Sequence, residues 1–199
     1  MRIVEYQIRR YSLDQGALEI EYIEEYFGEF SRRKKATEVI ERLSGRDHQI
    51  LMAEAALSDD SSTVVPVSYK VSHELSLNET DPKLVDLVSR LRDCISFEGR
   101  KILYSWIGGT RNDWRGKGFF RALTEEQESW AIDNEFDEIV VKTKNRLYGM
   151  RGTLDHLEFN VVKYESHLDD NRESKVYLSK PLGVEVLNKH RSRRSVVGK

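Results

Sequence analysis

The part of the sequence best suited to chemistry is a short run of glycines and cations, Arg115-Gly116-Lys117-Gly118. Glycine has no side chain, so an anion can approach the backbone N–H groups at these positions closely. If a helix begins here, its first N–H groups lack intrahelical partners and its dipole presents positive charge at the same point. Arg115 and Lys117 add full positive charges. This combination predicts a phosphate-binding turn at the start of a helix.

The turn differs from two common phosphate-binding motifs. A Walker A loop carries Gly-Lys-Ser/Thr after four free positions, and no such run is present here. A Rossmann fingerprint needs a third glycine and a later ribose-binding acid, and both are missing. Taken alone, the segment fits a simple tight turn as well as a phosphate site, so the surrounding elements must decide.

Apolar periodicity predicts the elements that would position the turn. Residues 101–109 read as a buried strand before it, and residues 117–134 as a helix after it. Asn134 would end that helix in the left-handed conformation. Further elements are predicted downstream: a strand at 138–143, a helix at 146–158, and strands at 159–165 and 175–179.

The first half of the chain is predicted to hold further strands and helices. Asp81-Pro82 is a helix-start signal, because a capping carboxylate precedes a proline in the first turn. The other predictions are a strand in which Val4, Tyr6 and Ile8 alternate, one or two amphipathic helices over 17–44, and strands at 50–57 and 63–75, the latter with alternating Val65, Val67, Tyr69 and Val71.

The composition limits the class of protein. Of the 199 residues, 39% are hydrophobic and 33% are charged, which indicates one soluble, globular domain. The formal net charge is -2, so the balance gives no reason to expect nucleic acid or an anionic membrane as partner. No apolar run approaches the ~20 residues of a membrane span, and the start of the chain has no signal-peptide core. We therefore expect a cytoplasmic protein.

The single cysteine, Cys94, excludes an internal disulfide. No Cys/His set has the spacing of zinc ligands, so no metal site is expected. The apolar stripe of the helix that begins at Asp81 extends to Ile95, and on this interpretation Cys94 lies in the core.

Residues 183–199 are basic and carry little apolar pattern. We therefore divide the chain into a domain at 1–182 and a basic C-terminal tail at 183–199. Solvated disorder is the simplest interpretation of the tail. A weak electrostatic contact with RNA or another acidic partner is the alternative, and deleting the tail would test it.

Together, the turn and its neighbouring elements resemble the GNAT superfamily of N-acetyltransferases. The family signature is Arg/Gln-x-x-Gly-x-Gly/Ala, after a strand and at the opening of a helix. Arg115 and Gly118 match its first and fourth positions, whereas Phe120 stands at the sixth, where a small residue is usual. Residues 140–146 resemble the family's fifth strand, which ends in an asparagine, here Asn145.

The resemblance spans residues 50–182 and is weaker over residues 1–49. It implies an α+β fold with three α/β/α layers. The sheet would be mixed and mostly antiparallel, with flanking helices. Its strands at 101–109 and 138–143 would run parallel and splay apart.

The same resemblance implies acetyl-coenzyme A as the cofactor. The amide near Gly108 would stabilise the oxyanion that develops on the thioester carbonyl. The implied cofactor-binding residues are the strand-end residues Gly108, Gly109 and Thr110 and Asn145 for the pantetheine arm, and Arg115, Gly116, Lys117, Gly118, Phe119 and Phe120 for the pyrophosphate.

The resemblance also implies direct attack of a primary amine on the thioester within a ternary complex. Glu74, at the end of the strand 63–75, is the candidate general base, and His73 is the neighbouring alternative. Their side chains should point to opposite faces of the strand. Leu154 replaces the tyrosine that the family often uses as general acid, so water or Tyr148 would protonate the thiolate.

The acceptor pocket would be lined by the first helices and by Tyr69, Tyr104 and Trp106, although core packing is the alternative role for these aromatic residues. The acceptor would be a polyamine-like or amino-acid metabolite, an antibiotic or a protein amine, and a homodimer is compatible with the resemblance.

A second hypothesis, motivated by Leu154 and Phe120, keeps the fold without the transfer reaction. The protein would then be a catalytically weak module that binds acyl-CoA in a regulatory or partner role.

Overall fold

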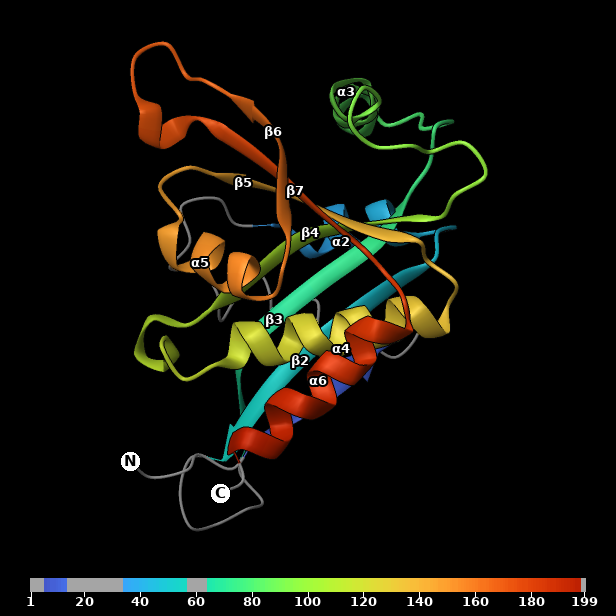
Figure 1. The fold of residues 1–199 in the computed structure, drawn as a ribbon. Coiled ribbons are helices and arrows are strands. Elements are labelled where there is room, and N and C mark those ends of the chain that lie inside the picture. Colours follow the sequence, from blue (N-terminus) through green and yellow to red (C-terminus); the bar gives the residue numbers. More distant parts are fainter. Residues whose placement is uncertain (1–5, 14–33, 57–63, 198–199) are drawn as a thin grey trace. The chain divides into compact units, whose positions relative to one another are not determined.

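Seven strands form the sheet in the computed structural model, which describes residues 6–13, 34–56 and 64–197 (Figure 1). Most of the predicted helical region 17–44 lies outside the described residues. The strands are β1 Tyr6–Tyr11, β2 His48–Ala56, β3 Val64–Leu75, β4 Ile102–Thr110, β5 Glu138–Lys144, β6 Asn160–Glu165 and β7 Lys175–Pro181. The α-helices are α2 Ala36–Leu43, α3 Pro82–Leu91, α4 Phe119–Asp133, α5 Tyr148–His156 and α6 Val184–Val197.

The strand pairing confirms the predicted mixed, mostly antiparallel sheet. The strands follow the order β1-β2-β3-β4-β5-β7-β6. β4 and β5 run parallel, whereas β1–β2, β2–β3, β5–β7 and β6–β7 are antiparallel. The parallel register ends at Ser105 and Val141, although β4 continues to Thr110. A parallel ladder that stops before its strands do matches the predicted splay.

The chain divides into two compact units, which we describe separately. Unit 1 contains the described residues of 1–73 together with 106–124. Unit 2 contains residues 74–105 and the described residues of 125–199. β3, β4 and α4 each contribute residues to both units.

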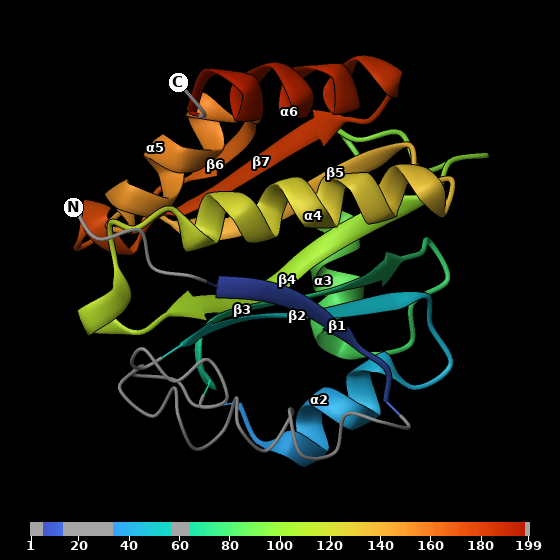
Figure 2. The same ribbon diagram turned by 90° about the horizontal axis from the view of Figure 1, so that it is seen from below.

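In unit 1 the sheet is covered on both faces. Ile50 of β2 belongs to a buried cluster with Val39 and Leu43 of α2. The next residue, Leu51, belongs to a second cluster with Phe119 of α4. Successive strand residues point to opposite faces, so α2 and the start of α4 bury alternate positions of the same strand (Figure 2).

In unit 2, α3 lies on one face of the sheet, and α5 and α6 lie on the other (Figures 1 and 2). α3 begins at the predicted signal. The side chain of Asp81 accepts a hydrogen bond from the backbone N–H of Lys83 at 2.7 Å, and Pro82 occupies the first helical position.

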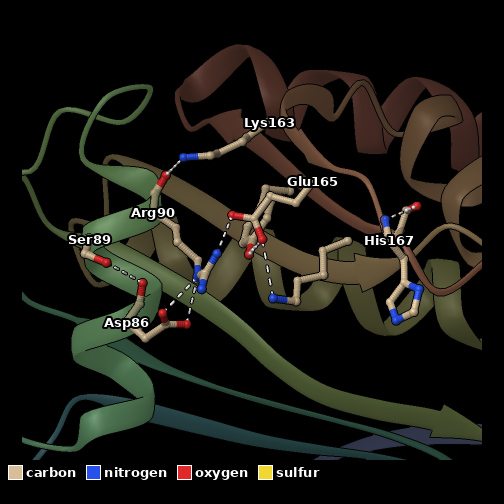
Figure 3. Close-up of polar contacts among 9 residues, drawn as sticks. Asp86, Ser89, Arg90, Lys163, Glu165 and His167 are labelled. Atoms are coloured by element: carbon tan, nitrogen blue, oxygen red, sulfur yellow. Dashed lines mark hydrogen bonds and ion pairs between the residues drawn. The ribbon is translucent and has the colours of Figure 1, made fainter. Parts of the chain in front are cut away.

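A set of charged residues connects α3 to β6 (Figure 3). Arg90 donates from Nε to Asp86 at 2.8 Å and from Nη1 to Glu165 at 2.8 Å, and Lys163 donates to the carbonyl oxygen of Arg90 at 2.6 Å. The hydrogen bond from Arg90 lowers the pKa of Asp86. Burial raises the pKa of Glu165, but hydrogen bonds from Arg90 and Tyr177 outweigh it, and that pKa is lowered overall.

Cys94 lies outside the core, contrary to the prediction. α3 ends at Leu91, and Cys94 follows it in a turn where its side chain is exposed. Ile95 and Phe97 take the buried positions instead. The helical spacing stops at the helix end, so the extrapolated apolar stripe placed Cys94 wrongly.

The predicted end of α4 also needs a small correction. The residue in the left-handed region is Glu135, with φ 61°, rather than Asn134. Asn134 instead donates from its side-chain amide to the carbonyl oxygen of Trp130 at 2.8 Å.

The interpretation of the tail as disordered is wrong for residues 184–197, which form α6. Val186 and His190 lie four residues apart on one side of this helix, and both are buried. His190 Nε2 lies 2.6 Å from one carboxylate oxygen of Glu128 in α4, and Lys180 Nζ of β7 lies 2.8 Å from the other. We call Glu128, Lys180 and His190 the Glu128 network. It anchors α6 to α4 and β7 within unit 2.

None of the helices in the described part of the chain combines the length and the apolar character needed to cross a bilayer.

Candidate cofactor-binding site

The predicted phosphate turn adopts a backbone that favours glycine. After β4, a short 3-10 helix spans Asn112–Trp114, and α4 begins at Phe119. Between them, Gly116 and Gly118 have φ values of 74° and 86°. A Cβ added at either glycine would meet no atom within 4 Å. The positive φ, rather than crowding, therefore requires glycine here, and the space beside the backbone is open to a ligand.

The turn presents its amides and cations at the surface of unit 1. The N–H of Ala122 donates to the carbonyl oxygen of Gly118 at 3.0 Å, so the amides of Gly118 and Phe119 precede this first helical bond. Arg115 and Lys117 are exposed. Arg115 Nε donates to the carbonyl oxygen of Thr110 at 3.2 Å. These groups could hold a diphosphate, because positive charge and helix-start amides lie on one short segment.

Phe119 anchors the turn in the core. It is 2% exposed, and its ring lies edge-on to Tyr6 at 4.9 Å and to Trp114 at 5.9 Å between ring centroids. The ammonium of Lys117 lies over the Trp114 ring, 4.1 Å from the ring centroid. The exposed glycines are therefore flanked by well-packed aromatic residues.

The end of β4 is held against β3. Ser68 of β3 donates to the carbonyl oxygen of Gly109 at 3.0 Å and pairs with the hydroxyl of Thr110 at 2.7 Å. A Cβ at Gly108 would lie 3.0 Å from the carbonyl oxygen of Tyr69, so glycine permits a close approach of the two strands. Gly108 itself is exposed. The predicted site in unit 1 thus joins a strand end and a helix start.

The unit 1 residues predicted for the acceptor lie together. Tyr69 and Trp106 contribute to the same cluster, and burial raises the pKa of Tyr69 to about 12, which keeps the phenol neutral. The ring of Trp106 lies 4.8 Å from the guanidinium of Arg42 and 5.3 Å from the ammonium of Lys34. Tyr104, the third predicted residue, belongs to unit 2, where it is buried opposite Val140 of β5.

The two candidate bases differ in exposure. His73 is fully buried, with its ring 5.7 Å from that of Trp106. Glu74, the first residue of unit 2, is half-buried near the end of β3. The His73 side chain therefore lies on the face of β3 that packs against Trp106 of β4, and strand alternation directs Glu74 to the other face of β3.

The remaining predicted residues lie near the end of β5 and in α5. The side-chain amide of Asn145 donates to the carbonyl oxygen of Asn171 at 3.1 Å, and its oxygen accepts from Arg151. Tyr148, the first residue of α5, is 64% exposed, whereas Leu154 is fully buried. Leu154 therefore packs in the core and offers no proton at the position where the family often has a tyrosine.

Sequence reasoning missed one residue that contacts the turn helix. Lys70 of β3 is 2% exposed, and its Nζ donates to the hydroxyl of Thr124 in α4 at 2.7 Å. The sequence prediction used only the alternating apolar residues of this strand and assigned no role to the residues between them. Ser68, Lys70 and Ser72 are all buried, because helices cover both faces of β3 in unit 1.

Within residues 6–13, 34–56 and 64–197, no group of three or more His, Cys, Asp or Glu residues is arranged to hold a metal ion.

No protein-family model matches the sequence, and no curated protein matches it. Solved structures do share the fold. NAA60 of Arabidopsis thaliana, solved in complex with acetyl-CoA, is 12% identical with a TM-score of 0.65, over 89% of this chain and 98% of that one. The ribosomal-protein-S18-alanine N-acetyltransferase of Escherichia coli is 10% identical with a TM-score of 0.60, over 90% and 96% of the two chains. The yncA protein of Salmonella typhimurium, solved with acetyl-CoA, is 12% identical with a TM-score of 0.59, over 90% and 95%.

At these identities the similarity shows the fold. This chain has the fold of these acetyltransferases, and a further similar structure, from Streptococcus pneumoniae, is described as an acetyltransferase of the GNAT family. The predicted GNAT-like architecture is therefore confirmed.

Proposed function

We propose that this protein is an acetyl-CoA-dependent N-acetyltransferase that acts on a primary amine. One observation carries the proposal: the exposed turn with Gly116 and Gly118 at positive φ opens α4, with Arg115 and Lys117 beside it. Such a turn binds a diphosphate through backbone amides and the helix dipole. Acetyl-CoA carries a diphosphate, and two of the similar structures contain acetyl-CoA.

The end of β4 would bind the rest of the donor. Its ladder with β5 ends at Ser105, and the strand continues through Gly108 to Thr110. Pantetheine amides would pair with the backbone of Gly108, Gly109 and Thr110. The amide near Gly108 would polarise the thioester carbonyl, and removing one such donor typically slows an acyl transfer by about 100-fold or more. By the family resemblance, Asn145 would face the pantetheine arm.

The reaction would be a direct transfer. The amine nitrogen bonds to the carbonyl carbon, the carbon–sulfur bond breaks, and coenzyme A leaves as a thiolate. Glu74 would take the proton of the attacking amine, with His73 as the alternative base. Tyr148 or water would return a proton to the sulfur, and the exposure of Tyr148 leaves it accessible to solvent.

The acceptor would bind beside Trp106. α4 packs on one face of the unit 1 sheet, and Trp106 and Tyr69 belong to the cluster on the other face. An amine that reaches a thioester at Gly108 from that second face passes the ring of Trp106. Tyr104 is the third residue that we assign to the acceptor. Small metabolites and protein amines both remain in the proposed acceptor class.

A second function is favoured by one observation. Leu154 is fully buried where the family often has the general acid. The protein would then bind acyl-CoA without efficient transfer and act as a regulatory or partner module.

Calorimetry and a thiol-release assay separate these functions. Native protein is first titrated with coenzyme A. Protein with acetyl-CoA is then mixed with polyamines, amino acids, an aminoglycoside and short peptides with free N-termini. Thiol release with any amine supports the transferase, whereas binding without release from the panel supports the module. Absence of coenzyme A binding would overturn both.

A further inference from the structure

Lys70 is a charged residue in the interior of unit 1 that the proposed mechanism does not use. It lies opposite Leu51 of β2, on the face of the sheet that packs against α4, and only 2% of it is exposed. Lysine is seldom buried to this extent unless polar or aromatic groups surround its ammonium. The groups that surround the Lys70 ammonium are therefore the evidence for its role.

The ammonium of Lys70 contacts the start of α4. Its Nζ donates to the hydroxyl of Thr124 at 2.7 Å and lies 4.7 Å from the ring centroid of Phe120. The hydroxyl of Thr124 donates in turn to the carbonyl oxygen of Phe120 at 2.8 Å. One side chain of β3 thus reaches both the side chain and, through Thr124, the backbone of the first turn of α4.

The aliphatic stem of Lys70 lies against the other part of the candidate site. A Cβ added at Gly108 would lie 3.5 Å from Cγ of Lys70. The stem therefore packs beside Gly108 while the ammonium reaches Phe120. This single residue connects the strand end assigned to the thioester with the helix start assigned to the diphosphate.

The charge has a consequence for ligand affinity. A helix start carries partial positive charge, so a buried ammonium beside the first turns of α4 is repelled by it. A diphosphate at the turn is attracted by both. Because the surroundings of Lys70 have a low dielectric constant, this attraction extends further than it would in water. The charge of Lys70 would therefore stabilise a diphosphate bound at the turn.

We infer that Lys70 is a positioning residue for the acyl donor, which spaces Gly108 from the start of α4 and adds buried positive charge beneath the diphosphate. Phe120, at the sixth signature position, is part of this arrangement, because its ring contacts the ammonium and a small residue there would not. The inference rests on the proposed function.

The test measures binding of three probes by calorimetry: coenzyme A, ADP, which has a diphosphate but no pantetheine, and pantetheine, which has no phosphate. Lys70→Met keeps the volume of the stem and removes the charge. We expect coenzyme A and ADP to bind about tenfold more weakly, with unchanged pantetheine binding.

The matched control is Lys101→Met. The Lys101 ammonium also lies over an aromatic ring, 4.4 Å from that of Phe136, and donates to a carbonyl oxygen at 3.1 Å. This control should bind all probes as native protein does.

Coenzyme A affinity within twofold of native in folded Lys70→Met would overturn the inference. An equal loss for ADP and pantetheine would also overturn it, since that pattern indicates a general structural role. If Lys70→Met does not fold, Phe120→Leu keeps the lysine and removes the ring. We expect a loss of about threefold for the two diphosphate probes alone, and unchanged affinity would contradict the inference. Failure of the native protein to bind coenzyme A would instead overturn the proposed function, so the two failures are distinguishable.

Discussion

The turn before α4 carries exposed charged groups in unit 1, whereas the later part of α4 carries a buried carboxylate in unit 2, and the two sets differ in exposure and in partners. Arg115 and Lys117 are exposed and flank glycines, so their charges are available to a ligand. Glu128 is fully buried, and Lys180 and His190 contact its two oxygens. Exposed charges contribute little to folding, whereas an ion pair in the interior strongly penalises the loss of either partner. We therefore expect the exposed set to govern ligand binding and the buried set to govern the stability of the fold.

The largest expected effect comes from removing the buried carboxylate. Glu128→Leu would leave Lys180 as an uncompensated buried charge and lower the free energy of unfolding by about 3–5 kcal/mol. Urea denaturation followed by circular dichroism measures this. Asp133→Asn, an exposed change in the same helix, should shift it by less than about 0.5 kcal/mol. A loss below about 1 kcal/mol for Glu128→Leu would remove the distinction between the two sets of charges.

The second prediction concerns the exposed turn. Gly118→Asp places a side chain and a negative charge in the space assigned to the diphosphate and should weaken coenzyme A binding more than about 100-fold. Gly99→Asp is the matched control, because Gly99 has φ 67° and likewise no atom within 4 Å of an added Cβ. Both changes carry about 1 kcal/mol of backbone strain, but only Gly118→Asp should impair calorimetric binding. Native-like affinity in folded Gly118→Asp would show that the ligand binds elsewhere.

The exposure of Glu74 is intermediate between that of the buried Glu128 and that of the exposed turn, because its carboxylate is half-buried. If it is the general base, Glu74→Gln should lower kcat by about 100-fold with little change in coenzyme A affinity. The deficit should shrink as pH rises, because more of the acceptor amine is then already neutral. Glu79→Gln, also half-buried, is the control. A kcat within threefold of native would transfer the role to His73 or to water.

The smallest effect is expected at the partly exposed network of α3 and β6. The pKa values of Asp86 and Glu165 are lowered in the folded protein, so the unfolded chain binds more protons as pH falls. Their contribution to stability is therefore complete above the ordinary carboxyl pKa values of about 4 and is lost at lower pH.

Arg90→Met should abolish about 1 kcal/mol of this acid-dependent stability, measured as the difference between urea midpoints at neutral and acid pH. Arg92→Met, an exposed arginine just after the same helix, should leave the difference unchanged. A native-like difference in Arg90→Met would show that the network does not stabilise the fold.

The elements around the turn could be predicted because their signals are local. Gly116 and Gly118 require a conformation that few other residues adopt, and Asp81 caps α3 where the sequence indicates. The strands before and after α4 were also predicted to within a few residues, since their apolar runs end at turns.

The misses at Lys70, Ser68 and α6 share one cause, which is burial by an element distant in sequence, whereas Cys94 was misplaced because α3 ends at Leu91. Lys70 and Ser68 alternate with apolar residues as on an exposed face, yet α4 covers them. α6 looked disordered because its apolar content is small, and its anchor is the contact of His190 with Glu128, 62 residues earlier. A buried polar contact of this kind leaves no periodic pattern in a single sequence.

The stacking of Lys117 on Trp114 gives the turn an intrinsic optical reporter. An indole ring changes its emission when the electric field around it changes, and the ammonium lies 4.1 Å from the ring centroid. An anion that draws Lys117 away from the ring would alter that field. Tryptophan fluorescence of the unlabelled protein could therefore follow ligand arrival at α4 in real time, with Trp114→Phe to identify the source of the signal.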